Sequence, residues 1–198
     1  MTLHEAAHGY VAYKLGDDTA YLMGRVTINP LKHIDLFGTI IIPILLMMTS
    51  GFIFGWAKPV PINVTRLRKP KRDAAIVALA GPFSNLIMAI IWAGILKLGL
   101  TVDHHAHPLF MIFNLMGQAG LMINLVLMVL NLIPIPPLDG SRFLSYLLPP
   151  PWDYWFNRIT PFGILIILIL IFTGVLSYVL YPAVGWLEIL LLHLFQIR

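Results

Sequence analysis

Long uninterrupted apolar segments are the feature that most constrains the fold of this chain. Residues 74–98 read AAIVALAGPFSNLIMAIIWAGILKL and residues 161–180 read PFGILIILILIFTGVLSYVL. Segments of about 20 apolar residues are long enough to cross the hydrocarbon core of a bilayer. Because backbone groups in lipid must be hydrogen-bonded within the chain, such segments form helices rather than the alternating strands of a barrel. We therefore expect an all-α polytopic membrane protein.

Composition and charge support this class and exclude others. The chain is 59% hydrophobic and 11% charged, whereas soluble domains carry roughly 25% charged residues. It has no cysteine, which excludes disulfides and thiolate metal sites. Residues 57–73 contain a cluster of basic residues and only one acidic residue, Asp73. Such a cluster is typical of a cytoplasmic loop that follows the positive-inside rule rather than of nucleic-acid binding. The cluster comprises Lys58, Arg66, Arg68, Lys69, Lys71 and Arg72.

The apolar pattern predicts a series of membrane helices. Residues 1–15 read as the end of a helix that stops at Leu15–Asp18, and residues 19–35, with Gly24 and Pro30, predict a small β-like hairpin or loop. We expect about 5–6 membrane helices in a single domain, residues 1–198, without repeats. The predicted spans are 74–98, 110–133 and 161–181, followed by a shorter helix over 184–197.

Residues 37–57 present a topological conflict. If this segment crosses the membrane, the loops at 16–35 and 58–73 lie on opposite sides, although both carry basic residues. Pro43, Gly51 and Gly55 interrupt the segment, and broken helices are tolerated at membrane depth where protein or water surrounds them. We favour a re-entrant or interfacial hairpin, which places both loops in the cytoplasm and residues 99–108 outside.

A candidate metal site begins at residue 4. The pattern His-Glu-x-x-His places His4 and His8 one helical turn apart, where both imidazoles can reach one zinc ion. Glu5 stands beside the position of a water activated by that metal and can take its proton. The alternative is that His4 and Glu5 merely lie in water near a chain terminus. Ionisable groups within apolar spans usually mark a functional site, which favours the metal.

A third ligand is expected because catalytic zinc sites use three protein ligands and keep one position open. The best candidate is Asp139, which follows a long apolar span and three prolines. The prolines end the helix and hold the chain extended, and Gly140 is expected to allow a sharp turn after the acid. In isolation, Asp139 would be a turn aspartate at the interface.

Five motifs together resemble the site-2 protease family of intramembrane zinc metalloproteases. They are LHEAAHG (3–9), NPLKHID (29–35), FGWAKPVPIN (54–63), ALAGPFSN (78–85) and NLIPIPPLDG (131–140), and they extend over nearly the whole chain. The pattern resembles the compact bacterial branch that lacks a PDZ domain. The resemblance implies a zinc-dependent endopeptidase that cleaves transmembrane helices of membrane-tethered proteins.

The same resemblance implies the roles of individual residues. His4, His8 and Asp139 would hold one zinc ion, and Glu5 would be the catalytic acid and base. Asn131 matches an asparagine thought to steady the substrate or the oxyanion, and Asn85 matches a position implicated in substrate handling. The expected partners are a substrate helix and the lipid bilayer, with no nucleic acid. The expected location is the cell (inner) membrane, with the active site near its cytoplasmic side.

The start of the chain departs from the family pattern. Only three residues precede His4, and a helix of about 15 residues rises about 22 Å, less than the roughly 30 Å hydrocarbon core. We therefore expect that the N-terminal part of the first span is missing from this sequence.

Other readings remain open at this point. A non-catalytic zinc-binding or helix-binding scaffold of the same fold is the main alternative to a protease, and a metal transporter is a more distant one. His104, His105 and His107 read as an exposed polar loop rather than a second metal site, His33 as structural and His193 as interfacial.

Overall fold

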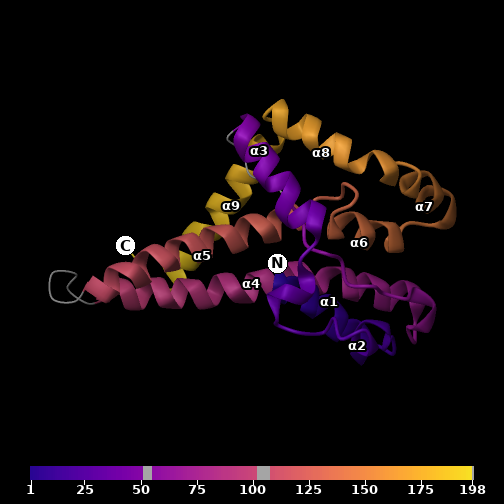
Figure 1. Ribbon diagram of the computed structural model, residues 1–198, viewed down its shortest axis with the longest axis horizontal. Coiled ribbons are helices and arrows are strands. Elements are labelled where there is room, and N and C mark those ends of the chain that lie inside the picture. Colours follow the sequence, from indigo (N-terminus) through magenta and orange to yellow (C-terminus); the bar gives the residue numbers. More distant parts are fainter. Residues whose placement is uncertain (51–54, 102–107, 198) are drawn as a thin grey trace. The chain divides into compact units, whose positions relative to one another are not determined.

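The computed structural model describes residues 1–50, 55–101 and 108–197, and the secondary structure of these residues is helical (Figure 1). Four of the described helices are long and apolar enough to cross a membrane: Pro70–Thr101, Met111–Leu132, Pro150–Phe172 and Val175–Leu194. The segment Leu36–Met48 is a shorter apolar helix. The prediction of an all-α polytopic membrane protein is confirmed, and the described residues contain four such helices where about 5–6 were expected.

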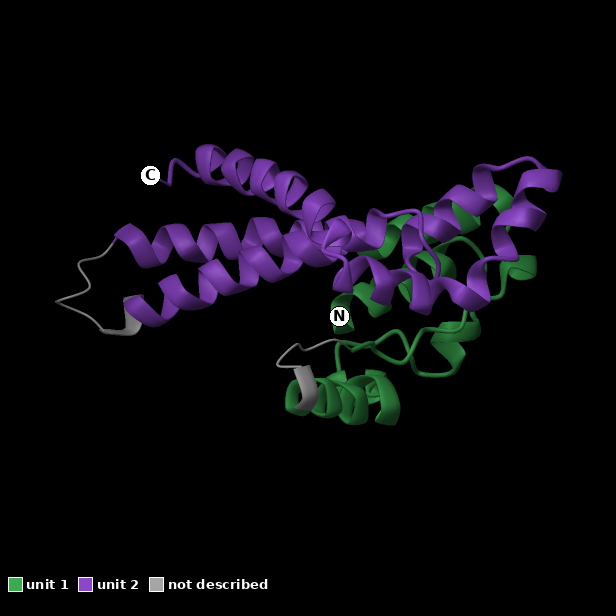
Figure 2. Ribbon diagram, turned by 90° about the horizontal axis from the view of Figure 1, so that it is seen from above, with its two compact units in different colours: residues 1–81 green, residues 82–198 purple. Residues whose placement is uncertain are grey.

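The chain divides into two compact units, Met1–Gly81 and Pro82–Arg198, with the boundary inside helix α4 (Figure 2). The prediction of a single domain over residues 1–198 stays a prediction. The first unit contains α1 (Thr2–Lys14), α2 (Thr19–Leu22), η1 (Pro30–His33), η2 (Leu36–Ile41), α3 (Ile42–Ser50), η3 (Val64–Arg66) and the start of α4 (Pro70–Thr101).

Helix α1 ends where the sequence predicted. Gly16 adopts φ +114°, a left-handed conformation that favours glycine, and the Asp17 N–H donates to the carbonyl of Ala12 at 2.9 Å. These features form a Schellman-type stop. The following loop corrects one expectation, since residues 19–22 and 30–33 form helical turns and no described residue between 19 and 35 belongs to a strand.

The two ends of the segment that was predicted to re-enter lie together within the first unit. The Lys58 N–H donates to the His33 carbonyl at 2.9 Å, and the Trp56 N–H donates to the Gly38 carbonyl at 3.0 Å. Asp35 caps η2 by accepting the Gly38 N–H at 2.7 Å. Residues 51–54 lie outside the described residues.

The second unit is built on three long helices. A buried apolar cluster joins α4 to α5 (Pro108–Leu132) and α9 (Val175–Leu194). Glycines on α5 allow close packing, since a Cβ at Gly120 would lie 2.2 Å from the Trp92 ring. The shorter elements are α6 (Asp139–Leu147), α7 (Pro150–Asn157), η4 (Thr160–Phe162) and α8 (Gly163–Phe172).

The predicted boundary near residue 182 was wrong. The break lies at Thr173–Gly174, where Gly174 adopts φ +76°, and Pro182 lies inside α9. Membrane helices tolerate an internal proline because neighbouring groups satisfy the freed backbone. The left-handed glycine, rather than the proline, therefore ends α8. The polar stretch 149–160 contains α7, which forms over residues 150–157.

Candidate active site

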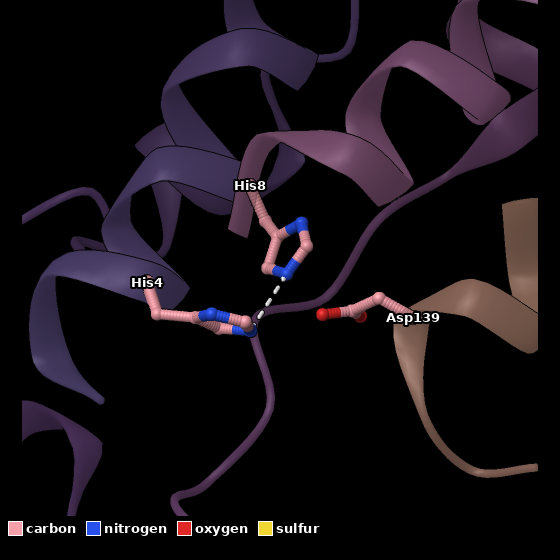
Figure 3. A group of neighbouring side chains, drawn as sticks. All are labelled: His4, His8 and Asp139. Atoms are coloured by element: carbon pink, nitrogen blue, oxygen red, sulfur yellow. Dashed lines mark hydrogen bonds between the residues drawn. The ribbon is translucent and has the colours of Figure 1, made fainter. Parts of the chain in front are cut away.

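The two histidines of the His-Glu-x-x-His motif lie on one face of α1 with their rings turned toward each other (Figure 3). Their Nε2 atoms are 3.2 Å apart, and the ring planes meet at 82°. Both residues are buried, with exposed fractions of 7% for His4 and 5% for His8. The helical spacing thus brings the Nε2 atoms of both histidines to one point.

The backbone of α4 fixes the tautomer of His8. The Nδ1 atom of His8 lies 2.7 Å from the carbonyl oxygen of Val77. Because a carbonyl only accepts, Nδ1 of His8 carries the proton and its Nε2 presents a lone pair.

The spacing of this pair fits a zinc ion. Two nitrogens, each 2.0–2.1 Å from a tetrahedral zinc, lie about 3.3 Å apart, close to the observed 3.2 Å. The donors are imidazole nitrogens, and the chain has no thiol. The tautomer that the Val77 carbonyl selects leaves Nε2 of His8 as the nitrogen that could bind a metal.

Glu5 accepts a hydrogen bond from the backbone of residue 60. Its Oε2 accepts the N–H of Val60 at 3.1 Å. Val60 lies between Pro59 and Pro61, which have no N–H, so it is the only possible backbone donor of residues 59–61. The extended segment that carries Val60 thereby orients the carboxylate next to His4.

Asp17 fastens this extended segment to the end of α1. Its side chain is completely buried and accepts the N–H of Asn63 at 2.6 Å and the N–H of Thr19 at 3.1 Å. The Arg68 N–H donates to the Leu15 carbonyl at 3.1 Å nearby. Asp17 was missed as a supporting residue, because its partner at residue 63 is 46 positions away and the sequence signals only a loop.

The second unit places Asn131 and Asp139 at neighbouring helix ends. Asn131 stands one residue before the end of α5, and its Nδ2 donates to the Leu127 carbonyl at 2.8 Å. Asp139, also drawn in Figure 3, is the first residue of α6 and is 7% exposed. The positive end of the helix dipole stabilises a carboxylate at this position.

Gly140 has a different role from the predicted sharp turn. It is helical and does not adopt positive φ, so the predicted turn was wrong. A Cβ at this position would lie 2.2 Å from the carbonyl oxygen of Leu132 and 2.7 Å from that of Ile133. Glycine therefore lets the first turn of α6 approach the end of α5, and this contact fixes Asp139 relative to Asn131.

The remaining predicted residues differ in their burial and contacts. Asn85 is buried in the second-unit part of α4, with 3% of its surface exposed. His33 is buried and hydrogen-bonds through Nε2 to the Thr27 carbonyl at 3.0 Å. His193 is exposed in the last turn of α9. His104, His105 and His107 lie outside the described residues.

Comparison with known proteins identifies several relatives. Over 188 residues the chain is 42% identical to the Bacillus subtilis protein named "Putative zinc metalloprotease YwhC", covering 92% of this chain and 80% of that protein. It is 30% identical over 190 residues to "Putative zinc metalloprotease Rip2" of Mycolicibacterium smegmatis, covering 94% and 68%, and 26% identical to Rip2 of Mycobacterium tuberculosis H37Rv, covering 94% and 69%. No protein-family model and no solved structure matches the chain.

Proposed function

The chain belongs to the zinc metalloprotease family of YwhC and Rip2, and from this premise we propose that it is an intramembrane endopeptidase of the site-2 protease type. Its substrates would be transmembrane helices of membrane-tethered proteins. The observation that carries this proposal is the buried pair of Nε2 atoms of His4 and His8, 3.2 Å apart, in a chain with four membrane-length apolar helices in its described part.

Asp139 is the proposed third ligand. Asp139 is 93% buried at the start of α6, and a bound cation would balance the charge of its carboxylate there. Two imidazoles and one carboxylate form a ligand set known from catalytic zinc sites, and three protein ligands leave one position open for the reaction. We propose one zinc ion per chain.

Bound zinc would polarise the scissile carbonyl and lower the pKa of water at the site to near neutrality. Glu5 takes the proton of the attacking water and delivers it to the departing amine. The Val60 N–H holds Oε2 of Glu5, which leaves Oε1 as the oxygen that carries the proton. In this proposal Asn131 would donate its second N–H to the developing oxyanion, and Asn85 would hold the substrate backbone.

Substrate geometry and membrane position follow from the same proposal. A helical carbonyl is already hydrogen-bonded, so the substrate must unwind before cleavage, and helix-breaking residues near the cut accelerate it. His8 lies six residues before the end of α1, which corresponds to about 9 Å along the helix. If the basic segment at 58–72 is cytoplasmic, the site lies on the cytoplasmic side of the cell (inner) membrane.

The test is Glu5→Gln in proteoliposomes that contain a reporter with one cleavable transmembrane helix. We expect cleavage to fall by at least about a hundredfold while zinc content stays unchanged, because Glu5 moves protons but does not bind the metal. Glu188→Gln on α9 is the matched control, since it makes the same change outside the site. If Glu5→Gln cuts as fast as its parent, the protease mechanism is wrong. A parent that holds zinc but never cuts would instead support a scaffold.

A further inference from the structure

We propose that Gly81 is a positioning residue for the two imidazoles of the candidate metal centre. It lies on α4, in the same compact unit as both histidines. A Cβ at this position would lie 2.3 Å from Nε2 of His8, and 2.5 Å and 2.6 Å from Cε1 and Nε2 of His4. Contacts under 3.0 Å are not tolerated, so any side chain at residue 81 must displace both rings.

The atoms that a Cβ would meet are those that the proposed function needs. The Nε2 atoms of His4 and His8 are the proposed zinc ligands, and they face the helix backbone where a methyl group would stand. Glycine at this position therefore lets both imidazole rings pack directly against the backbone of α4. This contact aligns the two nitrogens.

Val77 and Gly81 act from one face of α4, because residues four apart in a helix lie one above the other. The Val77 carbonyl holds Nδ1 of His8 at 2.7 Å, and Gly81 accommodates Nε2 on the other side of the same ring. The ring cannot move away from residue 81 without straining the hydrogen bond to Val77. The His8 ring is therefore not free to rotate away from a methyl group at residue 81. Such a methyl group would shift the two Nε2 atoms out of alignment.

The first test measures metal affinity and rests on the proposed zinc site. Purified parent, Gly81→Ala and Gly94→Ala are titrated with zinc in competition with a chromophoric chelator. Gly94 is the matched control on the same helix, since its Cβ would make only an ordinary contact at 3.6 Å with Phe195. We expect Gly81→Ala to bind zinc 10- to 100-fold more weakly, the range seen when groups that orient metal ligands are lost. Gly94→Ala should bind within about twofold of the parent, as expected for a distant, independent site.

The second test identifies the contact without any metal. Thermal unfolding is followed for Gly81→Ala in the parent and in the double variant His4→Ala/His8→Ala, where the imidazoles are absent. We expect a clear decrease in Tm in the parent background and little or none in the second. This difference separates a clash with the rings from a general effect of alanine on α4.

The outcomes distinguish this inference from the proposed function. A parent that binds no zinc overturns the proposed function, and with it the chelating role of the pair. Zinc affinity of Gly81→Ala equal to that of the parent overturns the positioning role alone. An equal decrease in Tm in both backgrounds shows that the methyl group meets something other than the imidazoles and also overturns it.

Discussion

Nδ1 of His8 and the carbonyl oxygen of Val77 lie 2.7 Å apart, although 69 residues separate them in the chain. This hydrogen bond links α1 to α4 inside the first unit and selects the tautomer in which Nε2 of His8 can bind a metal. A backbone acceptor cannot be removed by a side-chain substitution at Val77. The orientation of His8 therefore depends on the position of α4, not on the identity of residue 77.

Removing one imidazole should abolish tight metal binding. The protein as purified should hold about one zinc per chain, and His8→Ala or Asp139→Ala should reduce this to a small fraction, because two ligands do not retain the ion. Elemental analysis of purified protein gives the stoichiometry, and X-ray absorption should show nitrogen and oxygen ligands without sulfur. His193→Ala, exposed at the end of α9, is the control. Full occupancy in His8→Ala would exclude the assigned site.

Chelation should inhibit cleavage reversibly, without unfolding the protein. Removal of zinc with a strong chelator should stop cleavage of the membrane reporter, and added zinc should restore it, because the ion supplies an essential part of the chemistry. The cleavage rate before, during and after chelation is the measurement. Cleavage that continues at the original rate after complete zinc removal would rule out a metalloprotease mechanism.

The backbone donor at residue 60 can be tested by comparing two substitutions. Val60→Pro removes the N–H that Glu5 accepts, whereas Val60→Ala keeps it and removes only side-chain packing. A hydrogen bond to a charged group contributes about 1.5–3 kcal/mol, so we expect kcat of Val60→Pro to fall about tenfold or more below that of Val60→Ala. Equal kcat values for the two variants, measured on the membrane reporter, would show that this donor does not orient Glu5.

Residues 16–24 and 58–72 should lie on the same side of the membrane. Asp17 accepts the Asn63 N–H, and Asp18 forms an ion pair with Arg66, so these segments contact each other. Because the chain has no cysteine, Leu22→Cys and Lys71→Cys each introduce a single reporter at an exposed position. A membrane-impermeant thiol reagent should label both from the cytoplasmic face, and His105→Cys from the opposite face. Labelling of residues 22 and 71 from opposite faces would make residues 37–57 a true span.

Gly140→Ala should destabilise the second unit. The added methyl group would stand 2.2 Å from the Leu132 carbonyl oxygen, a backbone atom that cannot rotate away. Overpacking of this kind costs about 1–3 kcal/mol, which should lower the Tm in detergent by several degrees. Gly185→Ala on α9 is the control, because no atom lies within 4 Å of its added Cβ. If Gly140→Ala and Gly185→Ala have the same Tm, the close contact between Gly140 and the end of α5 does not contribute to stability.

The sequence predicts the parts of the site that lie close together in the chain. Helical spacing places His4 and His8 on one face, and the structure confirms this arrangement. Their supports could not be predicted, because the contacts of Val77, Gly81 and Val60 join residues 55 to 77 positions apart. Gly81 is visible in ALAGPFSN, but nothing local to that motif shows that imidazoles pack against it.

Helix existence was easier to predict than helix ends. Apolar length alone locates α4 and α5, because lipid requires every backbone group to be paired internally. The break between α8 and α9 was expected between residues 181 and 184 but lies at Gly174, where the chain adopts a left-handed conformation that leaves no periodic signal. The loop after α1 was expected to be β-like because of its composition, yet its described turns are helical, as local hydrogen bonds outweigh weak strand propensity there.

The prolines on either side of Val60 also bear on how the chain avoids unwanted partners. An extended segment normally exposes a row of N–H groups that can recruit a strand from another molecule. In residues 59–61 only Val60 has such a group, and Glu5 already occupies it. This stretch of three residues therefore has no free N–H left for edge-to-edge pairing with another copy of the chain.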